Sequence, residues 1–153
     1  MPPALSVREK IYEDIVATLN TITVSNGYAT TLGTVRRGAL SPLETDVMPT
    51  ASLIPVSDEP TYGVGVNRWQ ITCTIRIWID AVSIATAAAT LEALIADVQV
   101  ALQVDNRRSG NAEQTLTGLI QYLYLQSTET IAGADLVFMI DYKTSLTSPR
   151  VAL

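Results

Sequence analysis

The sequence predicts an α+β fold: a mainly antiparallel sheet of about five strands with two helices packed on one face, in the order α-β-β-β-α-β-β. Three observations predict it. One stretch alternates apolar and polar residues like a long strand, two segments have helical periodicity, and the strand-like segments are joined by turns. The 153 residues suggest one domain, 1–153, with flexible termini at 1–5 and 147–153.

The long strand is predicted over 67–80, NRWQITCTIRIWID, where period-2 alternation holds for six repeats. Its odd positions from Trp69 to Ile79 are all apolar, and they span roughly 36 Å. Its even positions are polar except for Trp78. A strand of this length is expected to be the spine of the sheet.

The first helix is predicted over 6–22 because Ser6 and Glu9 form a capping box and apolar residues recur every three or four positions. The second is predicted over 83–104 with Ser83 as its N-cap. Only two residues separate it from the long strand. It is therefore expected to fold straight back across the sheet.

The remaining strands are weaker in the first half of the chain and apolar on both sides in the second half. A weak strand is predicted over 28–37, and a short one over 51–56, where Pro55 indicates an edge or a strand end. A loop is expected over 57–66. Strands over 116–126 and 134–146 are apolar on both faces. Two helices cover one face only, so we expect a partner subunit on the other.

Composition excludes several classes of function. A net charge of −5 without a basic run argues against a protein that binds nucleic acid by neutralising its phosphates. The absence of histidine removes the commonest general base and most zinc sites, and one cysteine excludes an internal disulfide. No uninterrupted apolar run reaches membrane-spanning length, and no secretory segment opens the chain. We expect an intracellular compartment. The low charged fraction, 16%, fits burial in an oligomer or a surface of Thr, Ser and Gln, and both remain open.

No catalytic, cofactor-binding or metal-binding residue is predicted, and the protein is not expected to be an enzyme. The carboxylate pairs Glu13-Asp14 and Asp58-Glu59 are expected on solvated surface, the first on a helix and the second in a loop. Gly63-Val64-Gly65 lacks the following helix of a phosphate-binding turn.

Two features have an alternative to a purely local role. Arg107 and Arg108 follow the second helix, where they either complement its dipole or contact an acidic loop of another subunit. Trp78 is either covered by a local side chain or an anchor of an interface.

The order of elements resembles the tail terminator (tail completion) proteins of long-tailed bacteriophages. The resemblance covers nearly the whole chain, from IYEDIVATLNTI through VRRG, PTASLIPVSDEP and RWQITCTIRIWID to LEALIADVQVALQVD and the closing hairpin. A D-x-R-x-x-G-type loop is matched by Asp105, Arg107 and Gly110.

The resemblance implies a structural virion protein that forms a ring, typically a hexamer, at the head-proximal end of the tail. Such a ring ends tube polymerisation and joins the head, so its partners are further copies of itself, the tail-tube protein and a head-completion or connector protein. DNA passes the channel without specific binding, no membrane is involved, and assembly occurs in the host cytoplasm. We expect subunit contacts at Arg76, Trp78, Arg107, Arg108, Tyr122 and Tyr124, and lumen- or partner-facing acidic loops at Glu44, Asp46, Asp58 and Glu59.

Two other functions stay open from the sequence. The protein could be another head–tail connector or the tail-tube subunit, with the segment 38–66 as a stacking loop. A small enzyme or ligand-binding domain is the third possibility, with a pocket lined by Asp80, Arg76 and Asp141.

Overall fold

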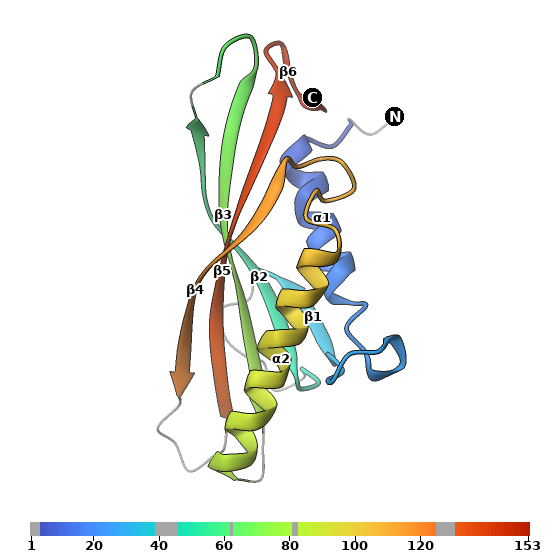
Figure 1. Ribbon diagram of the computed structural model, residues 1–153, viewed down its shortest axis with the longest axis vertical. Helices are drawn as coiled ribbons and strands as arrows, with labels where there is room; N and C mark the ends of the chain where they lie inside the picture. The colour runs from blue at the N-terminus through green and yellow to red at the C-terminus, as the bar shows by residue number, and fades with distance from the viewer. Residues whose placement is uncertain (1–3, 39–45, 62, 81–82, 125–130) are drawn as a thin grey trace.

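The computed structural model describes residues 4–38, 46–61, 63–80, 83–124 and 131–153, with the side chains of Ile84 and Tyr124 excepted. Two helices lie on one side of a long, twisted sheet (Figure 1). The elements are α1 Val7–Leu19, η1 Val24–Asn26, β1 Thr34–Arg37, β2 Thr50–Thr61, β3 Asn67–Asp80, α2 Ile84–Val104, β4 Gln114–Tyr124, β5 Ile131–Ser145 and β6 Ser148–Ala152. The predicted α+β class, element order and single helical layer are confirmed.

The strand order is β1-β2-β3-β5-β4. β6 pairs with the end of β5, on the same side of β5 as β4. β5 therefore lies between β3 and β4, although it follows both in sequence. All pairings are antiparallel except β1 with β2, which is parallel. The sheet is thus mainly antiparallel, as predicted, with one parallel pair at its edge.

The core lies between the sheet and the helices. β3 contributes its predicted odd positions, from Ile71 to Ile79, and they are fully buried. The paired register places Phe138 beside Cys73 and Leu136 beside Ile75 on the same face. α2 adds Leu91, Leu94, Val98 and Leu102, and α1 adds Val7, Ile11, Ile15 and Leu19. The helices begin as predicted, because Ser6 and Ser83 accept hydrogen bonds from the backbone N–H of Glu9 and Thr86.

Several boundaries differ from the sequence prediction. α1 ends at Leu19 rather than Ile22, and only the last four residues of the predicted strand 28–37 form β1. β2 continues to Thr61 through the predicted loop, with a bulge between Pro55 and Ser57. The predicted tail contains β6. Pro55 does lie at an edge, because β1 pairs with β2 only as far as Leu53.

By length and composition, the stretch Ala85–Val104 could cross a membrane, although two acidic residues interrupt it. Its buried face packs on the sheet through Leu91, Leu94 and Val98. Packing in the core explains the apolar character of this helix.

Candidate assembly surface

The sheet face opposite the helices carries an ion pair at its centre. The Arg76 guanidinium donates to both carboxylate oxygens of Asp135, each at 2.6 Å, from the neighbouring strand. The hydrogen bond to Asp135 raises the pKa of Arg76 above its ordinary value. Bidentate geometry of this kind fixes both side chains against the sheet. Arg76 therefore forms an ion pair within its own subunit. Its predicted contact with another subunit stays a prediction.

Trp78 lies on the same face and is 6% exposed in the single chain. Its ring packs on Gly133 of β5, the residue directly opposite in the register. Its indole nitrogen is buried without a hydrogen-bond partner among the described residues. Trp78 is thus largely covered within its own subunit. A role as an interface anchor stays a prediction.

β4 exposes the largest apolar side chains near the sheet edge. Leu119 is 67% exposed and Leu116 is 40% exposed. Tyr122, one of the predicted contact residues, is 42% exposed and lies on the helix side, where its hydroxyl donates to Glu92 of α2. The side chain of Tyr124 lies outside the described residues.

The described residues of the predicted acidic loops have different surroundings. Asp46 binds Arg36 on the open face, and Glu44 lies outside the described residues. Asp58 and Glu59 are in β2, so placing them in a loop is wrong. Asp58 is turned toward α1, where it accepts from the Tyr142 hydroxyl at 2.8 Å and pairs with Arg8. Glu59 is exposed, and its partner-facing role stays a prediction.

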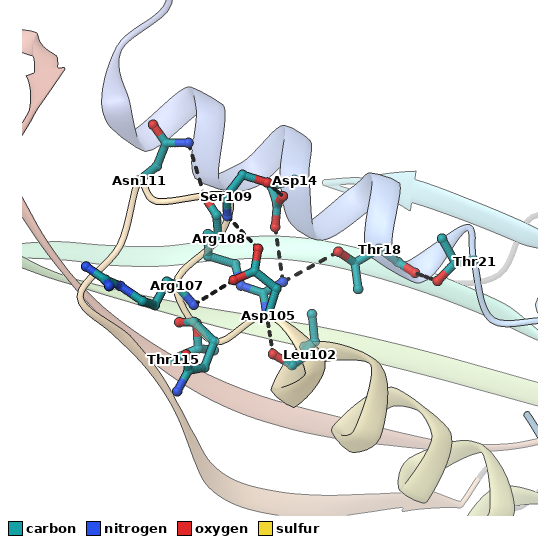
Figure 2. A network of polar contacts seen from close by, with 11 residues as sticks. Asp14, Thr18, Thr21, Leu102, Asp105, Arg107, Arg108, Ser109, Asn111 and Thr115 are labelled. Atoms are coloured by element: carbon teal, nitrogen blue, oxygen red, sulfur yellow. Dashed lines mark hydrogen bonds and ion pairs between the residues drawn. The ribbon is translucent and has the colours of Figure 1, made fainter.

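Arg108 is fully buried, although the sequence placed it on an interface. Figure 2 shows its guanidinium between the two helices. It donates to Asp14 and Thr18 of α1 and to the carbonyl of Leu102 in the last turn of α2. Burial lowers the pKa of Arg108, and the charges of Asp14 and Asp105 oppose that shift. This side chain satisfies the end of α2, as the helix-dipole alternative expected, and is not available at the surface. Arg107 is exposed.

The loop from Asp105 to Gly110 is shaped by its side chains and by left-handed backbone. Arg108, Ser109 and Gly110 all have positive φ, which glycine alone adopts without cost. Asp105 accepts from the backbone N–H of Arg107 and Ser109, and these bonds lower its pKa. The D-x-R-x-x-G pattern therefore corresponds to a built turn that directs Arg108 inward (Figure 2).

Sequence reasoning missed the importance of Asp14, which it placed on solvated surface with Glu13. Asp14 accepts from Arg108 at 3.1 Å and from the Ser109 hydroxyl at 2.8 Å. Asp97 is a buried carboxylate on α2, which accepts from the backbone N–H of Ala29 and Thr30 and holds that segment on α2. Asp14 lies beside the apolar stripe of α1, which is a weak signal in the sequence. Asp97 follows Ile95 and precedes Val98 on the buried side of α2.

The structure does not bring Asp80, Arg76 and Asp141 into one pocket. Asp141 accepts from the amides of Gln70 and Gln114 at the far end of β3, and ten residues of β3, roughly 33 Å, separate Gln70 from Asp80. A hollow of about 550 Å³ includes Asp141 but neither of the other two. Within the described residues, no group of three His, Cys, Asp or Glu is arranged to hold a metal ion.

Comparison with known proteins finds weak likeness among solved structures. No family model matches the chain, and no curated protein matches it. Among solved structures, a chain from the "Virion of native gene transfer agent (GTA) particle" aligns with a TM-score of 0.46 and 14% identity, covering 92% of this chain and 96% of that chain.

Proposed function

We propose that this protein is a non-enzymatic structural subunit of a phage-like virion, and that copies of it close into a ring at the head-proximal end of the tail. The ring would end tube polymerisation and provide the surface that joins the head. The residues that resemble tail terminator proteins support this proposal, since they occupy the helices, the long strand and the D-x-R-x-x-G turn in the expected order.

The observation that carries the proposal is the incomplete cover of the sheet. Both helices lie on one face, while Leu116 and Leu119 near the β4 edge remain exposed. Large exposed apolar side chains at one edge are typical of a surface that a partner covers. A ring requires that one surface of the subunit meets a different surface of the next copy.

Negative-stain images and sedimentation velocity of the purified protein test the proposal directly. We expect closed rings, or association with the ends of purified tail tubes. A protein that remains monomeric at all concentrations and never binds tube ends contradicts it.

A tail-tube or connector role is the second candidate. The β2–β3 hairpin reaches beyond the helices in Figure 1, and tube subunits commonly stack their rings through an extended loop. Long filaments of the protein alone would favour this role over a terminator.

A further inference from the structure

We propose that β4 of one copy pairs edge to edge with β1 of a second copy, so that the sheet continues from subunit to subunit. This inference rests on the proposed ring and names the strands that close it. The two strands lie at opposite ends of the strand order, β1-β2-β3-β5-β4. Neither has another strand on its outer side among the described residues.

The directions of the two edge strands fit this pairing. β1 runs parallel to β2, and each further step through β3, β5 and β4 reverses direction. β4 therefore runs antiparallel to β1. Neighbouring copies in a ring keep the same orientation about the axis, so β4 meets the next β1 as an antiparallel pair.

β1 and β4 also lie at the same height along the strand direction, on opposite sides of the sheet. Arg36 of β1 is joined through Ser52, Arg76 and Asp135 to Gln121 of β4, residue by residue. Two residues further along, Thr34 is level with Leu123 through the corresponding pairs. A ring without a vertical offset thus places Arg36 opposite Gln121 of the neighbouring copy, with matching faces of the sheet.

The chain protects one part of its sheet edge and leaves β4 unprotected. Beyond Leu53, the outer edge of β2 carries Pro55, Pro60 and a bulge, devices that discourage strand pairing. β4 contains no proline and no charged residue along its eleven positions, although it has one bulge. An uncharged strand of roughly 36 Å with a free edge is suited to accept another strand.

The charges of the two edges are complementary. On the β1 side, Arg36 and Arg37 form ion pairs with Asp46 and Glu9 of the same subunit, so pairing with the uncharged β4 leaves neither arginine without an anion. Further along the sheet, exposed Arg150 of β6 lies on the same edge as β4, and exposed Glu59 lies on the β2 edge. Neither has an ionic partner among the described residues, and side-by-side copies bring these opposite charges toward each other.

Cysteine cross-linking tests this pairing in the full-length protein. Arg36→Cys and Gln121→Cys are combined in one chain, oxidised with copper phenanthroline and separated without reductant. Four strand spacings, about 19 Å, prevent a bond within one subunit, because a disulfide needs Cα atoms within about 7 Å. We expect a ladder of covalent oligomers, roughly tenfold more abundant than in either single variant.

Matched control variants distinguish strand pairing from random collision and from unfolding. Gln121→Cys with Val64→Cys, at the fully exposed turn between β2 and β3, measures random collision. Thr34→Cys with Leu123→Cys tests the same register independently if the first pair unfolds the protein, as judged by circular dichroism. Cross-linking by Gln121→Cys alone would mean that β4 pairs with β4 and would overturn the inference. Rings without any ladder from either pair would overturn it while leaving the proposed function intact, whereas a strictly monomeric protein would overturn both.

Discussion

The Arg108 guanidinium lies 3.1 Å from the carboxylate of Asp14, a residue 94 positions earlier in the chain. The arginine is fully buried and the aspartate side chain is 18% exposed. This ion pair fastens α1 to the turn that follows α2 (Figure 2).

Removing the carboxylate should destabilise the protein more than removing the cation. Asp14→Ala leaves a buried guanidinium without its anion, and we expect it to lower the free energy of unfolding by about 3 kcal/mol. Arg108→Met leaves no buried charge and should cost less. Urea unfolding measures both, with Glu13→Ala on the adjacent position as the control. An Asp14→Ala midpoint equal to that of Glu13→Ala would contradict this role.

The turn after α2 should make stability depend on acid pH. Backbone N–H groups hold the pKa of Asp105 below its ordinary value of 3.8. A lowered folded-state pKa contributes stability above the unfolded pKa, and that contribution is lost as pH falls through the folded pKa. In Asp105→Asn, we therefore expect the free energy of unfolding to fall less steeply below about pH 4. Asp80→Asn, at an exposed position without an ionic partner in the described chain, is the control variant, and equal slopes in the two variants would contradict this role of Asp105.

Gly133 should tolerate no side chain beneath Trp78. A Cβ at this position would lie 2.5 Å from the Ile77 carbonyl oxygen and 2.6 Å from the Trp78 ring. We expect Gly133→Ala to cost about 1–3 kcal/mol through overpacking, together with a shift in tryptophan fluorescence. In Gly118→Ala the nearest atom is 3.2 Å away, so the loss should be smaller. Equal losses from the two variants would be inconsistent with this packing.

The Tyr142 hydroxyl should be a stabilising group beneath α1. Its burial and its bond to Asp58 raise its pKa above the ordinary value. In Tyr142→Phe the poorly exposed Asp58 carboxylate keeps its ion pair with Arg8 but loses the hydroxyl donor, at an expected cost of about 1–3 kcal/mol in thermal or urea unfolding. Tyr28→Phe removes a hydroxyl with no described partner and serves as the matched control. Comparable losses in both variants would show that the hydrogen bond is unimportant.

The thiol of Cys73 should be unreactive in the folded protein. Burial raises its pKa to about 12, so the thiolate is scarce near neutral pH. We expect the native protein to react with a disulfide reagent far more slowly than the urea-unfolded protein at the same pH. Rapid native labelling would mean that β3 opens readily, and would also require a Cys73→Ala background in the cross-linking experiment.

The sequence predicted the elements whose signal is periodic and local. β3 and both helices follow this rule, because their faces repeat along many consecutive residues. Errors arose where tertiary contacts decided the outcome. The bulge before Ser57 returns Asp58 to the helix side and carries β2 through a stretch with two prolines. Alternation alone could not predict it.

The charged residues of the candidate surface were harder to place than the fold. Arginine is a residue type that is usually exposed. The inward direction of Arg108 depends on the left-handed turn and on Asp14 across the helical layer. Trp78 was assigned correctly to the face opposite the helices, but its cover depends partly on Gly133 in a strand distant in sequence. Pairings across 50 or more residues cannot be derived from local pattern.

The position of β5 between β3 and β4 has a consequence for synthesis of the chain. Both neighbours leave the ribosome before β5, so β3 keeps one unpaired side until residues 131–145 have been made. Contacts between distant segments are slow to form, and an unpaired strand invites aggregation. Folding is therefore expected to wait until nearly the whole chain has emerged, and a protein truncated before Ile131 should aggregate rather than fold into a smaller unit.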